Sequence, residues 1–378
     1  MFWSFIYWAS SAIVTINFTV LCLFGCLLYE YYKLPSRRES PSDQTQKLMM
    51  NRARFRLFRL DYVAIREVLN SLDPIDYINF SRASKSCKAL ASIKKSYQVC
   101  LTFGICPVFM IGNGINNYAV RWTKEKQKDG TRWIKTWPDE WREYLLKYSE
   151  NPLGAMKEFY MHARSLMGID IDSVVVRMDD FEEQFREILY WLNSTFGEIP
   201  AVRVWGNNQR QEKLQYVLDN VKCKNSLKIF WKTTENLTLE IPETIKELRI
   251  CYGSWITLNY LMSLKMSKFA LLHTYLTNKD INFFFKSWMQ MKSHKNLESF
   301  EINLTNREDF IAIGLRDIPY EMGPTIPGPY WCYTAVEGSF EITRKDGLTA
   351  SICIFESLMK ECSAVMCTRL PFVRVSGR

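Results

Sequence analysis

The chain has 378 residues, of which 47% are hydrophobic, 14% aromatic and 24% charged. This composition excludes intrinsic disorder, and the length predicts two or three structural units. The formal net charge of +9 is concentrated in residues 33–59, which hold eight Lys or Arg against Glu39 and Asp43. The remaining body is only mildly basic, so the charge does not indicate binding to nucleic acid.

The first 32 residues predict a transmembrane anchor. Residues 1–29 contain no Asp, Glu, Lys or Arg, and Ala12–Tyr29 approaches the roughly 20 residues that cross a bilayer. A cleaved signal peptide would need a basic start and a shorter apolar stretch, and this segment has neither. We therefore expect residues 1–32 to span a membrane once.

The residues that follow this segment indicate its orientation. The nearest cations are Lys33, Arg37 and Arg38. Because cations collect on the cytoplasmic side of a membrane, they place the C-terminal body in the cytoplasm. If translation starts at Met49 or Met50 instead, the product lacks the anchor and is cytoplasmic or nuclear. Residues 33–51 form a basic, polar linker in both cases.

Residues 52–97 predict a compact module of three helices. The first helix has an apolar stripe with helical spacing, formed by Ile65, Val68, Leu69 and Leu72. Asp73 and Pro74 supply the N-cap and first position of a second helix, on which Ile75 and Ile78 face inward. About 40 residues are too few for three helices to bury their apolar faces alone. The module should therefore need a partner or the adjoining domain.

This run of residues resembles an F-box, in the form common among nematode F-box proteins. The positions that match are Leu60, Val63, Ile65, Val68, Leu69, Leu72, Pro74, Ile78, Ser84, Lys85 and Leu90. Asp61 stands where the family normally has proline, so the first turn is capped by a carboxylate and not fixed by a ring. The resemblance implies binding to a Skp-type adaptor of cullin-RING ubiquitin ligases through Leu60, Ile65, Val68, Leu69, Leu72, Pro74, Ile75 and Ile78.

Residues 98–170 predict a β-rich connecting region followed by a helix. The predicted strands are short and form a small meander, at Val99–Phe103, Val108–Ile111, Tyr118–Trp122 and Arg132–Thr136. Four tryptophans in this region suggest a base-stacking platform, but packing in the core or at an edge is simpler without a positive groove. Pro152 begins a helix with one apolar side.

A repeated pattern begins at residue 171. The template, apolar residues at its first, fourth and sixth positions and a polar ninth, starts at residues 171, 199, 245, 266 and 297, and a weaker copy without the first apolar residue starts at Lys224. Most of the spacings lie in the leucine-rich-repeat range of about 20 to 29 residues. Helical stripes separate several copies, and Thr277–Asp280 predicts a capping box at the start of one helix. The pattern predicts an irregular, leucine-rich-repeat-like α/β solenoid with six parallel strands.

The last repeat is followed by a predicted β-hairpin. Phe340 and Ile342 alternate with polar residues, Asp346–Gly347 makes the turn, and the alternation resumes to Ile354. We expect this hairpin to cap the solenoid, which leaves residues 357–378 as a tail. Residues 277–302 and 340–355 resemble the F-box-associated domain of the second type, found after nematode F-boxes, so residues 171–356 are interpreted as that domain. The predicted fold class is α/β.

The sequence predicts no catalytic or metal site. Three histidines are dispersed, and the motifs of zinc proteases, serine hydrolases, P-loop proteins and kinases do not occur. The eleven cysteines form no CxxC pair, which argues against a disulfide scaffold or zinc module, although Cys362 and Cys367 leave a metal or redox role open. We expect no cofactor and no enzymatic activity of the chain itself.

Two functions fit these predictions. The first is a substrate-recognition subunit of a cullin-RING ubiquitin ligase, with a Skp-type adaptor, a cullin scaffold and an unknown protein substrate as partners. The second is a membrane-tethered repeat scaffold that has lost adaptor binding through Asp61. In both, the exposed strand residues are the candidates for contact with the bound protein: Arg177, Arg203, Trp205, Lys228, Arg249 and Glu301.

Overall fold

The computed structural model describes residues 60–368, with gaps at 92–96, 114–115, 138–139, 181–183, 208–209, 234–236, 325–332, 336–337 and 358–361. The described residues belong to two units, divided between Leu72 and Asp73. The predicted anchor and linker fall before residue 60 and lie outside the described residues.

The first unit contributes one described helix, α3 (Tyr62–Ser71). Asp61 caps it, because its Oδ1 atom accepts a hydrogen bond of 2.8 Å from the backbone N–H of Ala64. The φ angle of Asp61 is −66°, which is the angle that a proline ring imposes. The unusual residue at this position therefore preserves the backbone direction that the family's proline would set.

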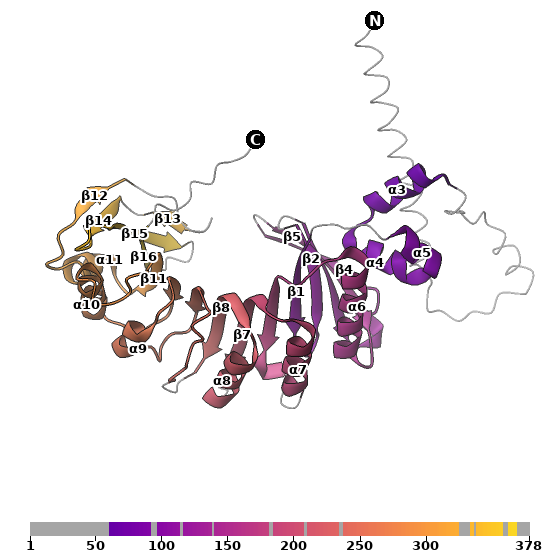
Figure 1. Cartoon of the computed structure of the whole chain (residues 1–378), viewed down its shortest axis with the longest axis horizontal. Helices are drawn as coiled ribbons and strands as arrows, with labels where there is room; N and C mark the ends of the chain where they lie inside the picture. The colour runs from indigo at the N-terminus through magenta and orange to yellow at the C-terminus, as the bar shows by residue number, and fades with distance from the viewer. Residues whose placement is uncertain are drawn as a thin grey trace, which may run out of the picture. The chain divides into compact units, whose positions relative to one another are not determined.

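The second unit contains the remaining described elements (Figure 1). Its helices are α4 (Pro74–Ala83), α5 (Lys85–Leu90), α6 (Pro152–Met167), α7 (Phe185–Thr195), α8 (Gln211–Asn220), α9 (Leu258–Ser263), α10 (Asn278–Met289) and α11 (Arg307–Asp309). Short 3-10 turns occupy Lys126–Lys128 (η2) and Met178–Asp180 (η3), and a π-helical turn (η4) occupies Phe310–Gly314.

Side-chain caps explain where several of these helices begin. Asp73 accepts from the N–H of Asp76 at the start of α4, and Ser84 caps α5 in the same way. The predicted capping box of α10 is confirmed, with Thr277 and Asp280 each bonded to the other's backbone. The predicted proline starts of α4 and α6 are also confirmed.

All described strands belong to one mixed sheet of 16 strands. Those of the N-terminal part are β1 (Gln98–Phe103), β2 (Val108–Gly112), β3 (Asn116–Thr123), β4 (Arg132–Trp137) and β5 (Glu140–Tyr148). The central ones are β6 (Ser173–Arg177), β7 (Ile199–Asn207), β8 (Cys223–Lys232), β9 (Glu247–Ile250), β10 (Lys268–Leu271) and β11 (Ser299–Leu304). The C-terminal ones are β12 (Glu321–Gly323), β13 (Tyr333–Ala335), β14 (Ser339–Thr343), β15 (Thr349–Ser357) and β16 (Cys362–Cys367).

The strands from β6 to β11 form the centre of the sheet. Each is hydrogen-bonded to the next one along the chain, and all five pairings are parallel. They coincide with the six copies of the sequence pattern. The order across the sheet is β12-β14-β15-β16-β11-β10-β9-β8-β7-β6-β1-β2-β3-β5-β4, and β13 pairs with β15.

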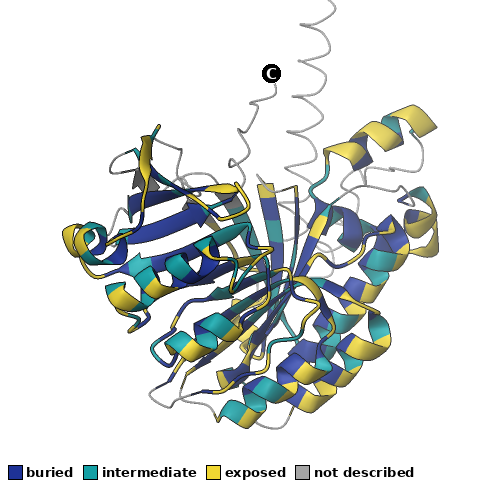
Figure 2. Ribbon diagram, turned by 60° about the vertical axis from the view of Figure 1, so that its left-hand side comes forward, coloured by how far each residue is buried: buried dark blue, intermediate teal, exposed yellow. Residues whose placement is uncertain are grey.

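Helices cover one face of this sheet. Trp191 of α7 lies 6.0 Å from Phe103 of β1, and Phe284 of α10 lies 4.6 Å from Phe300 of β11, both between ring centroids. On α6, Phe159 packs edge-on against Phe109 of β2. The strand residues on this face are almost all buried, whereas the outer sides of the helices are exposed (Figure 2). Because side chains alternate along a strand, every second residue points to the opposite face, away from these helices.

The predicted architecture of solenoid, separate meander and hairpin cap is wrong. Strand β5 lies between β3 and β4 and is parallel to β3, so these strands are not a meander. Strand β1 pairs in parallel with β6, which joins the connecting region to the repeats. Strand β16, predicted as part of a tail, lies between β11 and β15. The predicted solenoid, meander and hairpin are therefore parts of one continuous hydrogen-bonded sheet.

The transmembrane element of the predicted fold class, and the membrane localisation that followed from it, are corrected as well. Within the part of the chain that the structure describes, no helix combines the length and the apolar character that crossing a bilayer requires.

Candidate functional site

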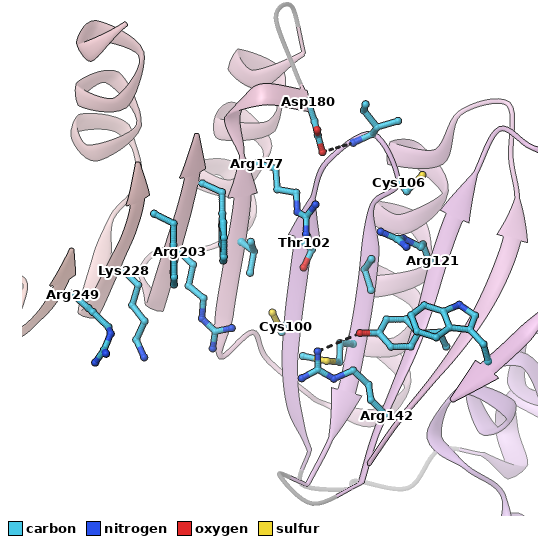
Figure 3. Close-up of a pocket in the computed structure, with 18 residues that line it drawn as sticks. Cys100, Thr102, Cys106, Arg121, Arg142, Arg177, Asp180, Arg203, Lys228 and Arg249 are labelled. Carbon is cyan, nitrogen blue, oxygen red and sulfur yellow. Dashed lines mark hydrogen bonds between the residues drawn. The ribbon is translucent and has the colours of Figure 1, made fainter. Parts of the chain in front are cut away.

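Three basic side chains stand side by side on neighbouring strands of the face that points away from the helices. Arg203 on β7 is the register partner of Lys228 on β8, and Lys228 is the partner of Arg249 on β9. Neighbouring strands lie about 4.8 Å apart, so three cations are held within about 10 Å. We call these three residues the basic row (Figure 3).

An acidic residue ends the basic row. The guanidinium of Arg249 reaches Glu301 on β11, with Nη1 and Oε2 3.0 Å apart. Ala270 of β10 lies between them in the register, and its small side chain lets the two longer ones meet above it. Both partners are largely buried, with 15% and 8% of their side-chain surfaces exposed, so this ion pair is shielded from solvent.

Burial and neighbouring cations both disfavour the charged form of Lys228. Burial lowers the pKa of Lys228 below its usual 10.5; Glu247 partly opposes this, and the guanidinium groups of Arg203 and Arg249 lower it further. The protonated form of Lys228 is thus destabilised, and an anion bound beside it would stabilise this form.

Two residues further along the strands, aromatic rings continue the same face. Trp205 of β7 and Phe230 of β8 are register partners, with ring centroids 3.9 Å apart and ring planes 1° from parallel. Trp205 is 40% exposed. Arg177 of β6 is the register partner of Trp205 on its other side. The open face therefore has a flat aromatic surface directly beside its basic side chains.

These residues line a hollow of about 960 Å³ on this face of the sheet. Further cations enter it from the N-terminal part of the sheet, where Arg121 lies on β3 and Arg142 on β5 (Figure 3). Arg142 donates a hydrogen bond to the hydroxyl of Tyr144, whose ring stacks on Trp133 at 4.0 Å. Among the described residues, the lining of the hollow thus contains six cationic side chains and one carboxylate, Asp180.

The structure brings the predicted contact residues together. The hollow is lined by five of the six, namely Arg177, Arg203, Trp205, Lys228 and Arg249. The sixth, Glu301, is tied to the hollow through its ion pair with Arg249. The sequence did not point to Arg121, Arg142 or the aromatic pair on β4 and β5, because these strands lie outside the repeat and β5 was not predicted as a strand. Alternation over Arg142, Tyr144 and Leu146 was the available signal.

The predicted adaptor-binding residues of the second unit are buried inside it. Ile75 and Ile78 are 3% and 0% exposed, and Pro74 is buried as well. Helix α4, which contains all three, packs against α6, β2 and β3. Their apolar side chains therefore serve the core of this unit, in agreement with the expectation that the small module needs the adjoining domain.

In the first unit, the predicted residues are only partly accessible. Ile65, Val68 and Leu69 are 6%, 7% and 1% exposed, whereas Leu60 and Leu72 are half-buried. The most accessible apolar side chains of α3 are two that were not among the predicted contacts, Tyr62 at 67% and Val63 at 68%. Among the described residues of this unit, the exposed side of α3 is the surface that another protein could contact without rearrangement.

A polar cluster fixes the start of α4 to the sheet. Arg132 of β4 forms ion pairs of 2.9 Å with Asp76 and 2.7 Å with Glu143, and it lies 3.8 Å from Asp73. Burial raises the pKa of Asp73 to about 7, and the Asp76 carboxylate adds to this rise, whereas the Asp76 N–H and Arg132 oppose it. Lys147 donates to Asn79 of α4 at 2.7 Å.

Among the described residues, no group of three or more His, Cys, Asp or Glu side chains could hold a metal ion. The cysteines of this part of the chain are free thiols, Cys362 and Cys367 among them. The site is therefore described by its charge and its aromatic surface.

Comparison with protein families identifies two domains. A family model described as F-box domain matches residues 57–98, and one described as F-box associated matches residues 236–302. The chain contains both domains. The second match includes Arg249 and Glu301, whereas Arg203 and Lys228 lie before it. No curated protein and no solved structure matches the chain.

Proposed function

We propose that this chain is a substrate-recognition subunit of a cullin-RING ubiquitin ligase. Its F-box would bind a Skp-type adaptor and thereby the cullin scaffold, and the open face of its sheet would hold a protein substrate. The observation that carries the proposal is the presence of an F-box domain and an F-box-associated domain in one chain. Ubiquitin transfer itself would be performed by other subunits.

The exposed side of α3 is the surface we assign to the adaptor. Tyr62 and Val63 present apolar side chains to solvent in the first turn of the helix, next to the half-buried Leu60. An isolated exposed apolar residue needs no explanation, but two adjacent ones in an F-box helix fit an apolar contact. Within the same helix, the buried residues Ile65, Val68 and Leu69 lie on the side that faces away from solvent.

The test is capture of the full-length chain by a purified Skp-type adaptor. We expect the adaptor to capture the unmodified chain but not a Val63→Asp variant, because the new carboxylate would have to be desolvated at the contact. Tyr275→Asp is the matched control, since Tyr275 is 81% exposed and lies in the sheet unit. Circular dichroism on each protein shows whether the fold is intact. A folded chain that is not captured, or a Val63→Asp variant that is captured equally well, would overturn the proposal.

A further inference from the structure

The hollow on the open face has more positive charge than its surroundings neutralise. Of the basic row, Arg249 is paired with Glu301. Arg203 and Lys228 form no ion pair with any residue that the structure describes, and the Glu247 carboxylate acts on Lys228 only at longer range. These two cations therefore lie on adjacent strands about 4.8 Å apart, with no ion-pair partner among the described residues.

Further cations line the hollow: Arg177, Arg121 and Arg142 lie on strands β6, β3 and β5. Asp180, the one carboxylate among the described lining residues, already accepts a hydrogen bond of 3.1 Å from the backbone N–H of Ile105. The positive charge is thus spread over several strands, which fits several negative groups along an extended ligand better than a single anion.

The chain's own terminal segments do not match this charge. Residues 33–59 have eight Lys or Arg and two acidic residues, and residues 369–378 have three arginines and no Asp or Glu. Neither segment supplies the negative charge that would complement the hollow, whereas an anionic group on another molecule would.

We propose that the hollow binds an acidic segment of a protein substrate. Carboxylates of the segment would pair with Arg203 and Lys228, and a neighbouring apolar side chain would rest against the exposed ring of Trp205. This inference rests on the proposed function, since it names the class of substrate that the receptor would recruit.

Two features favour an acidic peptide over a nucleic acid. The aromatic rings of Trp205 and Phe230 are stacked on each other, so no base can enter between them. Beyond Arg249 the face continues with Ala270, Glu301 and Val365, which offer no further cation to a phosphate backbone. A nucleic-acid strand repeats its charge along its whole length and would need cations to continue with it.

The experiment measures fluorescence anisotropy of a labelled peptide of glutamates around a central leucine, titrated with the full-length chain. The comparison probes are the same peptide with glutamine in place of glutamate, and a single-stranded oligouridylate of equal length. The test variant is Arg203→Gln/Lys228→Gln. The matched control is Arg186→Gln/Lys279→Gln. It removes two exposed cations from helices α7 and α10, which lie on the opposite side of the sheet from the hollow.

We expect the glutamate peptide to bind and the glutamine peptide not to bind. The affinity should fall as salt is raised, and by about tenfold or more in the test variant, but not in the control. Equal binding by the unmodified chain and the test variant, tighter binding of the oligouridylate, or no binding of the glutamate peptide would each overturn the inference.

Adaptor capture of the same proteins separates this inference from the proposed function. A chain that is captured by the adaptor but does not bind the glutamate peptide refutes the acidic substrate alone. A chain that binds the peptide but is not captured refutes the ligase function and leaves an acidic-peptide binding protein.

Discussion

Gly206 is the residue at which β7 approaches the indole ring of Trp231 most closely. A Cβ atom built on Gly206 would lie 2.5 Å from the ring, and Trp231 is fully buried in β8. We expect Gly206→Ala to lower the free energy of unfolding by about 1–3 kcal/mol, because the ring would have to move within a packed core. Urea unfolding measures this change.

Gly197 provides the matched control for this substitution. A Cβ atom at that position would have no heavy atom within 4 Å, so Gly197→Ala should change stability little. If both alanine variants unfold at the same urea concentration, the close contact between β7 and Trp231 is not a constraint on the sheet.

The carboxyl group of Asp73 makes stability depend on pH. Its pKa is raised to about 7 in the folded chain, above the usual 3.8, so between these values the folded chain binds more protons than the unfolded chain. The free energy of unfolding should therefore fall as pH rises from about 4 to about 7. The groups around Asp73 include Asp76, Arg132, Tyr97 and Tyr118, with Glu143 on the far side of Arg132.

The variant Asp73→Asn tests this assignment. Asparagine caps a helix about as well as aspartate, so α4 keeps its N-terminal hydrogen bond while the titrating group is lost. We expect the unfolding free energy of the variant to depend less on pH between about 4 and 7, and to exceed that of the unmodified chain near pH 8. Parallel curves for the two proteins would show that Asp73 is not the titrating group.

At the scale of elements, β16 determines whether the C-terminal strands belong to the sheet. It lies between β11 and β15, and Ala364 is the register partner of both Ile302 and Ile354. An N–H in the middle of a sheet points to one of its two neighbours, so Ala364→Pro removes a ladder hydrogen bond whichever neighbour it faces. We expect a loss of about 3 kcal/mol or more, and exposed strand edges that promote aggregation.

Ala364→Gly is the companion variant, because it keeps the N–H and should cost only about 0.5–1 kcal/mol. Thermal unfolding with light scattering distinguishes the two. Similar melting and similar scattering for both variants would mean that β16 is not held between its neighbours in solution.

Local patterns in the sequence predicted most of the individual elements. The capping box of α10 and the proline starts of α4 and α6 follow from side chains within one turn of the helix end. The six parallel strands follow from a repeat whose apolar positions face the helices. The order of strands at the two ends of the sheet could not be predicted, because the pairing of β5 with β3, and of β16 with β11, depends on contacts between distant residues.

The part of the candidate site that lies within the repeat could be predicted from the sequence, and the part outside it could not. The basic row occupies the fifth position of three successive repeats, which alternation places between two buried residues and therefore on the open face. Arg121 and Arg142 lie on strands outside the repeat and had no such signal. The apolar stripe of the F-box helices was identified, but periodicity alone does not tell whether Ile75 and Ile78 face a partner or the chain's own core.

At the scale of the molecule, binding and stability should oppose each other on the open face. Lys228 is held between Arg203 and Arg249, where burial and these cations disfavour its charge. Lys228→Met removes this repulsion while keeping the aliphatic stem, so we expect the unfolding free energy to rise by about 0.5–1 kcal/mol while the glutamate peptide binds more weakly. Lys265→Met is the control, because Lys265 is exposed and paired with Glu243, and its loss should neither stabilise the chain nor alter peptide binding. A Lys228→Met variant that is less stable and binds the peptide normally would show that the basic row serves the fold and not a ligand.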